Sequence, residues 1–314
     1  MLITGVHGFV GSNLVKALAD DHTIYGLDIV TPPKEGLETT FGWSALNELS
    51  DMELNAVIHL AGIAHDTKNQ TEAQKYFDVN LGLTQKIFDF FLESDIRKFI
   101  LFSSVKAAAN KVEGDVLTED VVPTPKGPYG ESKIAAENYI LSKRAEWEAQ
   151  GKEVYILRPC MIHGPGNKGN LNLLYNVVRK GIPWPLGRFE NKRTFTSIDN
   201  LCYVVNGLLT KSVASGIYHM ADDEAISTNE LIEIICSVLG KKAHIWHLPK
   251  GLMNGVAKVG GWLHLPLNPE RLQKLTENYV VSNAKIKAAL GIEQMPVWAG
   301  EGLEKTVRSF SIQG

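Results

Sequence analysis

The chain is poor in the features that mark several common classes of protein. Its three cysteines, Cys160, Cys202 and Cys236, lie far apart and form no CxxC pair, which indicates buried thiols in a reducing cytoplasm. The net charge is only -3 at pH 7 and no run of Lys or Arg occurs, so nucleic acid is not expected as a partner. No apolar stretch is long enough to span a membrane, and the first residues lack the basic segment of a signal peptide. We therefore expect a cytoplasmic protein.

What is present is an ordinary globular composition. The 314 residues, 44% hydrophobic and 21% charged, are enough for one large domain or two smaller ones. His244 and His247 stand close together in HIWH, but no neighbouring Cys, Asp or Glu completes a set of ligands. We expect a surface strand at that point and predict no metal site.

Short apolar runs alternate with amphipathic stretches in the first half of the chain. Several runs are apolar on both faces and rich in β-branched residues, as strands buried between helices should be. The expected strands are 2–4, 23–29, 56–61, 99–104 and 154–159, and the expected helices are 9–20, about 70–93 and 129–150. This alternation predicts an α/β fold with a Rossmann-type, doubly wound parallel sheet.

The pattern changes after Arg158. Proline and glycine crowd residues 159–187, and the further elements expected are helices near 170–180, 199–211 and from 227, with a strand at 216–221. A Trp- and Gly-containing stretch and a last amphipathic segment complete a smaller α+β lobe. We expect one domain from 1–160 with about 190–225, and a substrate-binding lobe from about 161–190 with 226–314.

The segment TGVHGFVG places Gly5, Gly8 and Gly11 between the first expected strand and the first expected helix. Glycine there permits a tight turn and lets backbone N–H groups and the helix N-terminus approach a pyrophosphate. Asp28 closes the second expected strand, where a carboxylate can accept hydrogen bonds from the ribose hydroxyls of adenosine and would repel a 2′-phosphate. The segment predicts a dinucleotide site that prefers NAD to NADP.

Two Tyr-x-x-x-Lys pairs lie ten residues apart, Tyr129 with Lys133 and Tyr139 with Lys143. Ten residues correspond to a rotation of about 280° around a helix, so the two phenols point in different directions. Tyr129 follows a proline-rich loop and so begins its helix at a cleft, and the strand that ends in Ser104 also points to that cleft. We predict that Tyr129 and Lys133 form the reactive pair and that the other pair is a solvated helix face.

These segments together resemble those of the extended short-chain dehydrogenase/reductases, in the NAD-dependent epimerase/dehydratase family. The resemblance runs nearly end to end and is specific because so many motifs occur in order. Its motifs are TGVHGFVG (4–11), HLAG (59–62), VN (79–80), YGESK (129–133), LRPCMIHGPG (157–166), RTFTSID (193–199) and SNAKIKAALG (282–291).

The resemblance implies a role for each matched residue. Tyr129 would exchange a proton with a sugar hydroxyl or ketone, while Lys133 would favour its phenolate and hold the nicotinamide ribose. Ser104 would bind the reacting oxygen, with Ser103 as the fallback, and Asn80 would brace the active-site strand. The implied cofactor-binding residues are Gly5, Gly8, Phe9, Val10, Gly11, Asp28, Leu60, Ala61, Gly62, Asn80, Tyr129 and Lys133. The implied substrate-binding residues are Ser104, Tyr129, Asn170, Arg193 and Arg271, of which Arg193 can pair with a diphosphate or, alternatively, with Asp199.

Departures from the family pattern reduce the number of reactions that fit this chain. Sugar 4,6-dehydratases carry Thr-Asp-Glu where SSVK stands, and Val105 and Lys106 cannot move the eliminated water. Many epimerases read SSSxxVYG there, whereas FSSVK resembles enzymes that reduce UDP-4-keto-6-deoxy sugars for surface polysaccharides. FGWSAL around Trp43 replaces the usual third-strand motif, so Trp43 is expected to pack near the adenine.

The resemblance therefore implies an enzyme that acts at C4 of a UDP-hexose. We place a 4-epimerase with a transient 4-keto sugar first, a NAD(P)H-dependent UDP-4-keto-6-deoxy-sugar reductase second, and an inactive NAD(P)-binding regulatory protein third. The family also implies a homodimer through helices 77–93 and 129–149, although IFDFFLESDI could equally face its own sheet. The apolar stretch 251–267 is expected to serve lobe packing or a subunit contact, and no membrane partner is expected.

Overall fold

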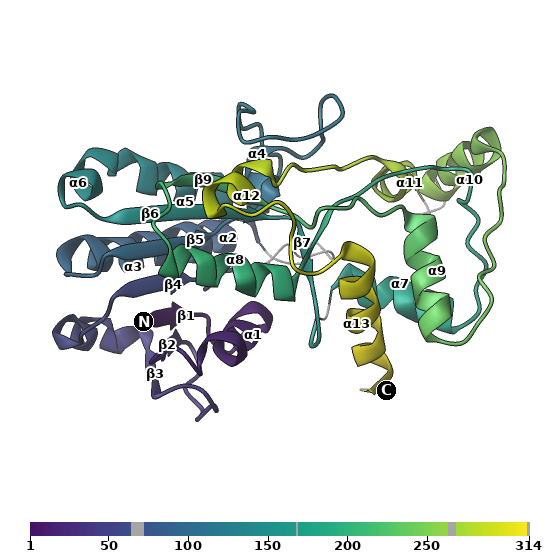
Figure 1. The fold of residues 1–314 in the computed structure, drawn as a ribbon. Coiled ribbons are helices and arrows are strands. Elements are labelled where there is room, and N and C mark those ends of the chain that lie inside the picture. The colour runs from purple at the N-terminus through teal and green to yellow at the C-terminus, as the bar shows by residue number, and fades with distance from the viewer. Residues whose placement is uncertain (64–71, 168, 263–267, 313–314) are drawn as a thin grey trace.

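Seven parallel strands form the main sheet of the protein, in the order β3-β2-β1-β4-β5-β6-β9 (Figure 1). The computed structural model describes residues 1–63, 72–167, 169–262 and 268–312. The strands are β1 (Leu2–Thr4), β2 (Tyr25–Asp28), β3 (Thr39–Gly42), β4 (Ala56–His59), β5 (Lys98–Phe102), β6 (Glu153–Pro159) and β9 (Gly216–Met220). From β1 the chain adds strands first toward β3 on one side and then toward β9 on the other, so the strand order reverses between β1 and β4. Ligands of such sheets bind at that point.

Successive strand residues face opposite sides of the sheet, and a layer of helices covers each side. Ile3 and Ile58 pack with α1 (Phe9–Leu18), α8 (Ile198–Thr210) and α12 (Ala284–Leu290). Leu2 and Val57 pack on the other side. The helices on that side are the 3-10 helix η1 (Trp43–Asp51), α3 (Gly82–Glu93), α5 (Pro128–Ser142) and α6 (Arg144–Ala149). The predicted doubly wound α/β fold is confirmed.

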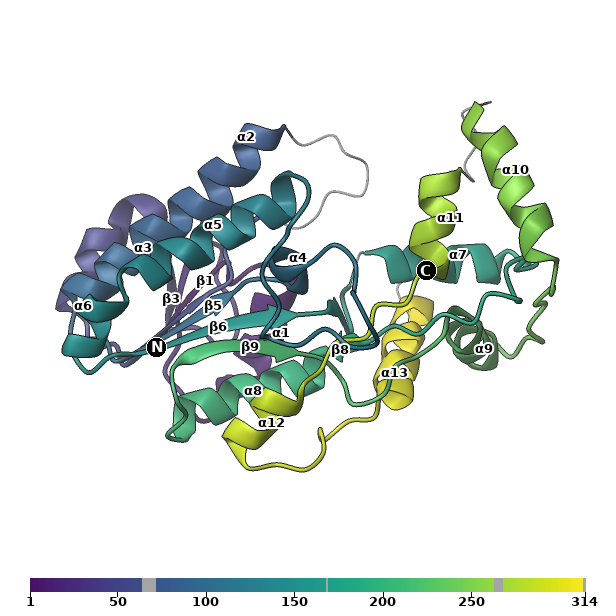
Figure 2. The ribbon, with the colours of Figure 1, turned by 90° about the horizontal axis from the view of Figure 1, so that it is seen from above.

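A smaller lobe lies beyond the carboxyl ends of the strands (Figure 2). Its elements are β7 (Met161–His163), α7 (Asn170–Arg179), β8 (Phe195–Ser197), α9 (Thr228–Val238), α10 (Lys250–Trp262), α11 (Pro269–Thr276) and α13 (Ala299–Ile312). Side chains of α7, α9 and α13 share one apolar core that includes Tyr175, Ile235 and Val307. None of the described helices is long and apolar enough to cross a membrane.

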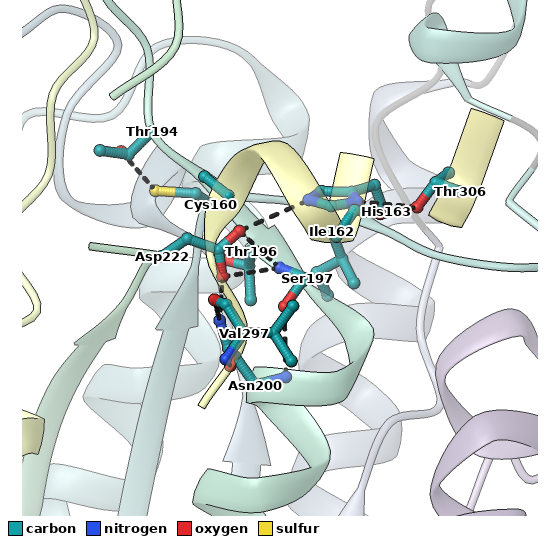
Figure 3. Close-up of polar contacts among 12 residues, drawn as sticks. Cys160, Ile162, His163, Thr194, Thr196, Ser197, Asn200, Asp222, Val297 and Thr306 are labelled. Atoms are coloured by element: carbon teal, nitrogen blue, oxygen red, sulfur yellow. Dashed lines mark hydrogen bonds and ion pairs between the residues drawn. The ribbon is translucent and has the colours of Figure 1, made fainter. Parts of the chain in front are cut away.

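A buried polar junction ties this lobe to the main sheet (Figure 3). Asp222, two residues after the end of β9, accepts hydrogen bonds from the backbone N–H of Ser197 at 3.0 Å and from Nδ2 of Asn200 at 2.7 Å. Its Oδ2 lies 3.5 Å from Nε2 of His163, and Nδ1 of that ring lies 2.9 Å from Oγ1 of Thr306 in α13. One carboxylate therefore connects the edge of the main sheet with β7, β8 and α8.

The structure differs from the expected elements in several places: the short strands β7 and β8 were not expected, and the strand expected at HIWH is present only as isolated bridges at Ile245 and His247. Residues Thr39–Gly42 form the edge strand β3, which the sequence analysis missed because it is short and half exposed. The expected helix 129–150 is two helices that meet at Lys143. The expected helix 70–93 consists, within the described residues, of α2 (Ala73–Tyr76), the π-helical turn η2 (Phe77–Leu81) and α3, and residues 70 and 71 lie outside the described part.

Candidate active site

The turn after β1 requires glycine for steric reasons. Gly5 has φ +68, and a Cβ there would lie 2.9 Å from the backbone N of Ala61. A Cβ at Gly11 would lie 2.5 Å from the carbonyl oxygen of Gly5, and one at Gly8 would lie 3.2 Å from the same oxygen. These distances show a turn packed too tightly for any side chain, at the start of α1, where Phe9 and Val10 form the first turn. Such a turn fits the pyrophosphate of a dinucleotide.

Asp28 lies at the end of β2, beside the glycine turn. Only 8% of the residue is exposed, and its carboxylate accepts hydrogen bonds from the N–H of His7 at 2.9 Å and of Ile29 at 2.7 Å. These contacts fix the carboxylate while leaving lone pairs for ribose hydroxyls. Lys34, which the sequence analysis missed, donates from Nζ to the carbonyl of Val6 at 2.9 Å and lies close enough to Asp28 to feel its charge.

The segment after β4 passes over the same turn and carries Leu60, Ala61 and Gly62. Oγ1 of Thr4 accepts hydrogen bonds from the N–H groups of Leu60 at 3.1 Å and Ala61 at 3.0 Å, and it lies 2.7 Å from Nδ1 of His59. Burial lowers the pKa of His59 to about 3, so this ring is neutral and serves as a hydrogen-bonding spacer.

Asn80 lies in the π-helical turn η2 and connects this segment to α5. Its Oδ1 accepts a hydrogen bond from the N–H of Ile63 at 2.8 Å, and its Nδ2 donates to Oγ of Ser132 at 3.0 Å. A Cβ on Gly62 would approach Oδ1 of Asn80 to 2.8 Å and Nζ of Lys133 to 3.3 Å. The backbone of Gly62 and the side chains of Asn80 and Lys133 therefore lie close together at one edge of the sheet.

Tyr129 begins α5 and meets Ser104, which follows β5 and caps α4 (Val105–Ala108). The Tyr129 hydroxyl is hydrogen-bonded to the Ser104 side chain. The ring of Tyr76 stands edge-on, with 6.2 Å between the ring centroids. Burial of the hydroxyl raises the pKa of Tyr129 above its usual value, although the Ser104 hydrogen bond acts in the opposite direction. In the protein alone the phenol is thus the stable form.

Lys133 lies one helical turn beyond Tyr129 on the same helix and is 8% exposed. Its Nζ donates to the carbonyl of Phe102 at 3.0 Å, which holds the ammonium at the end of β5. Burial lowers the pKa of Lys133 to about 8, and the nearby charge of Glu137 opposes that shift. The ammonium is still the main form at neutral pH, so a positive charge is stored one turn from the phenol.

Ser103 has a different environment from Ser104. Its hydroxyl donates to the carboxylate of Glu137, which also receives the guanidinium of Arg158. Ser103 therefore faces a buried ion pair and Ser104 faces Tyr129. The sequence analysis missed Glu137, although it lies four residues after Lys133 and hence on the same face of the helix.

The second Tyr-x-x-x-Lys pair is away from this group. The hydroxyl of Tyr139 donates to the carboxylate of Asp89, and burial together with that carboxylate raises the pKa of Tyr139 to about 12. Nζ of Lys143 lies 3.8 Å from Glu146 in an exposed ion pair. Helical rotation separates the two pairs, as the ten-residue spacing predicts.

Of the predicted substrate-binding residues, Asn170, Arg193 and Arg271 lie outside the main sheet domain. Arg193 lies 3.5 Å from the carboxylate of Glu277 and donates to the carbonyls of Glu277 and Lys274. The alternative of an Arg193–Asp199 pair is wrong, because Asp199 pairs with Lys305 at 2.8 Å. Asn170 and Arg271 are both exposed and lie in the first turns of α7 and α11, respectively.

Lys106 is a cation at the junction of the two lobes, and the sequence analysis gave it no binding role. Its Nζ lies 4.0 Å from the centre of the Tyr279 ring and donates to the carbonyl of Asn110 at 3.0 Å. Burial lowers the pKa of Lys106 to about 8, and the charge of Glu277 opposes the shift. Since its backbone N–H donates to Oγ of Ser104 at 3.2 Å, Lys106 also helps to orient that serine.

The glycine turn, the acid at the end of β2 and the Ser104–Tyr129–Lys133 group all lie at the reversal point of the sheet. This arrangement is that of a dinucleotide-dependent α/β enzyme. The model of the NAD dependent epimerase/dehydratase family matches residues 1–221, and the chain belongs to this family. The predicted family, the predicted class of enzyme and NAD as the cofactor are thereby confirmed.

Relatives with assigned reactions cover almost the whole chain. A UDP-glucose 4-epimerase of Vibrio cholerae is 30% identical over 99% of this chain and 95% of its own length. An N-acetyl-alpha-D-glucosaminyl-diphospho-ditrans,octacis-undecaprenol 4-epimerase of Escherichia coli O157:H7 is 26% identical over 98% of this chain and 94% of its own length. The solved UDP-glucuronic acid 4-epimerase of Bacillus cereus has the same fold, with a TM-score of 0.76, 20% identity and coverage of 99% and 96%.

Proposed function

We propose that the chain is a NAD-dependent 4-epimerase of a UDP-hexose, which inverts the hydroxyl at C4 through a transient 4-keto sugar. The observation that carries the proposal is the contact between Ser104 and Tyr129 at the sheet edge that also holds the glycine turn. Relatives that act at C4 of diphosphate-linked sugars support the position of the reaction. We also expect a cytoplasmic protein.

The residues around the glycine turn would hold NAD. The tight glycine turn at Gly5 and Gly11 brings the N-terminus of α1 to the place where a pyrophosphate would bind, and Asp28 would accept hydrogen bonds from the adenosine ribose. The chemistry that NAD supplies when bound is the removal and return of hydride at C4 of the sugar. Lys133, held by the carbonyl of Phe102, would bind the nicotinamide ribose.

Tyr129 moves the proton at O4. The phenol has a raised pKa in the protein alone, and the ammonium of Lys133 one turn away favours the phenolate. Tyr129 then takes the proton from O4 as the ketone forms and returns it when the hydroxyl is restored. Ser104 binds the reacting oxygen and keeps it in line with the phenol. The contact of Ser103 with Glu137 supports Ser104 for this role.

Arg193, Asn170 and Arg271 would bind the diphosphate. The planar guanidinium of Arg193 can exchange its contacts with Glu277 and with backbone carbonyls for paired hydrogen bonds to phosphate oxygens. Two of the reported relatives are named as epimerases of UDP-sugars, which favours UDP as the nucleotide. The E. coli relative indicates that a lipid diphosphate sugar is a second substrate class to test.

A reductase of UDP-4-keto-6-deoxy sugars is the second candidate, favoured by the FSSVK segment that holds Ser104 and Lys106. The two reactions differ in whether the cofactor is regenerated within one turnover. Denaturing the purified protein and identifying the released nucleotide separates them. Bound NAD+ that does not exchange with free NADH is expected, together with 4-epimerisation of UDP-glucose, UDP-N-acetylglucosamine or UDP-glucuronic acid. Consumption of NAD(P)H with a 4-keto sugar, and no epimerisation, would overturn the proposal.

A further inference from the structure

Helix α10 has two apolar stripes, and only one of them is packed. Met253 and Ala257 are buried against Leu186 and Leu272 of the smaller lobe. The other stripe is exposed to solvent, with exposed fractions of 54% for Leu252, 47% for Val256, 54% for Val259 and 80% for Trp262. Packing of the lobe therefore explains one stripe and leaves the second without a partner among the described residues.

The exposed stripe is continuous along the helix. Leu252, Val256 and Val259 follow the four- and three-residue spacing of a helix face and so fall within an arc of about 60°. Together, α10 and α11 project at the end of the smaller lobe that is farthest from the main sheet (Figures 1 and 2). Single exposed apolar side chains are common on protein surfaces, but an aligned row that ends in an exposed tryptophan is not.

The chain segment that carries this stripe has charged residues of one sign only. Residues 234–269 contain no Asp or Glu, although the whole chain is slightly acidic. The same segment contains four exposed lysines, Lys241, Lys242, Lys250 and Lys258, and a second exposed tryptophan, Trp246 at 53%. Of these, Lys250 and Lys258 are on α10 itself, and lysines on a helix whose apolar stripe ends in a tryptophan are typical of helices that lie in the interface of an anionic membrane.

We propose that the outer face of α10, formed by Leu252, Val256, Val259 and Trp262, docks on an anionic phospholipid bilayer. The contact is peripheral: the apolar stripe enters the headgroup boundary, and the lysines pair with lipid phosphates. This surface contains none of the residues assigned to catalysis. Membrane binding can therefore be present or absent whichever reaction the enzyme catalyses.

A second copy of the chain is a poorer occupant of this face. In a two-fold contact the same patch meets itself, so Lys250 and Lys258 of both copies would come together with no acidic residue from 234–269 between them. An anionic bilayer supplies the missing negative charge. The expected lobe packing of 251–267 holds for Met253 and Ala257, and the proposal concerns only the outer face of α10.

Vesicle co-sedimentation of the full chain tests the proposal. We expect binding to vesicles of equal parts phosphatidylglycerol and phosphatidylcholine, weaker binding to phosphatidylcholine alone, and a decline as salt rises. The double substitution Val256→Asn and Val259→Asn should lower the partition coefficient at least about tenfold, because two apolar side chains that would be buried in the bilayer are lost. Val122→Asn removes a valine elsewhere that is even more exposed, at 78%, and should leave binding unchanged.

Trp262 provides a second readout. Its fluorescence should shift to shorter wavelength on vesicle binding, and Trp262→Ser should abolish the shift while Trp298→Ser, at a residue 66% exposed, should retain it. Circular dichroism and turnover of a soluble UDP-sugar verify that each variant is folded. Equal pelleting of the wild type and the double variant would overturn the proposal. A dimer by light scattering that Val256→Asn and Val259→Asn dissociate, with no vesicle binding, would assign the face to a second copy instead.

Discussion

The carboxylate of Glu137 lies against the guanidinium of Arg158 inside the protein, with 2.6 Å between Oε2 and Nη2. Nε of Arg158 adds contacts of 3.0 and 3.1 Å to the two carboxylate oxygens, and both side chains are almost completely buried. Because Glu137 is on α5 and Arg158 on β6, the pair fixes the helix that carries Tyr129 and Lys133 against the sheet.

Removal of one partner should therefore destabilise the protein strongly. Glu137→Gln leaves the Arg158 charge buried and unpaired, which typically costs about 3–5 kcal/mol. Urea unfolding measures the loss. Glu148→Gln, in an exposed pair with Arg144 at 3.4 Å, is the control and should change stability by less than about 1 kcal/mol. An equal effect of both substitutions would contradict the structural role of the buried pair.

Tyr129→Phe should remove most of the activity without unfolding the protein. The loss of a positioned proton-transfer group lowers kcat by about 100- to 10,000-fold. Tyr139→Phe removes the other phenol of the repeated spacing and should retain kcat within about threefold, since its hydroxyl is bound to Asp89. Initial rates with the accepted UDP-sugar decide the matter, and similar losses in both variants would refute the choice of Tyr129.

Substitutions of the two adjacent serines should have different effects on activity and on stability. Ser104→Ala removes the partner of Tyr129 and should lower kcat about 100-fold, while the lost cap of α4 lowers the free energy of unfolding by about 1 kcal/mol. Ser103→Ala leaves a buried carboxylate with one donor fewer and should lower the free energy of unfolding by about 1–3 kcal/mol while activity is largely kept. The reverse assignment of kcat and stability losses would make Ser103 the catalytic serine.

A glycine comparison tests the cofactor turn. Gly5→Ala combines a positive φ with a Cβ only 2.9 Å from Ala61 N, so NAD binding should fall at least about tenfold. Gly114 has φ +82 but nothing within 4 Å of its Cβ position, so Gly114→Ala carries the strain without the clash. Isothermal titration with NAD+ measures both. If Gly114→Ala weakened binding equally, the close approach at Gly5 would not be the cause.

The lowered pKa of Lys106 should make the free energy of unfolding depend on pH. Its pKa is about 8 in the folded protein and near 10.5 when unfolded, so the unfolded chain binds more protons between these values and stability rises with pH there. Lys106→Met lacks this rise. The stability difference between wild type and variant should therefore move by about 2 kcal/mol in favour of the wild type from pH 7 to pH 9.5. A constant difference in urea unfolding at the two pH values would show that Lys106 stays charged.

Much of the fold follows from sequence patterns because buried parallel strands are apolar on both faces. Six of the seven strands of the main sheet were predicted on this basis, whereas β3 was missed, since Thr39–Gly42 is short and only half buried. The apolar residues of IFDFF were compatible with a dimer contact or with the protein's own sheet. The structure places Ile87, Phe88 and Phe91 in the core, so the homodimer stays a prediction from the resemblance alone.

The candidate site was less predictable than the fold. Spacing pointed to Tyr129, Lys133 and the glycines, because those residues belong to one local segment each. The Glu137–Arg158 pair and the position of Lys106 over Tyr279 join residues far apart in the chain, and no local pattern encodes such contacts. The same holds for the exposed stripe of α10, since sequence alone does not tell which apolar stripe of a helix is packed.

The contact between His163 and Thr306 bears on how the protein is made. It joins residues 143 positions apart, and Thr306 belongs to the last helix. During synthesis the main sheet and the catalytic group can be complete while α13 is still inside the ribosome. The smaller lobe can acquire its final orientation only once α13 has emerged, so a nascent chain should bind NAD before it can bind a sugar nucleotide.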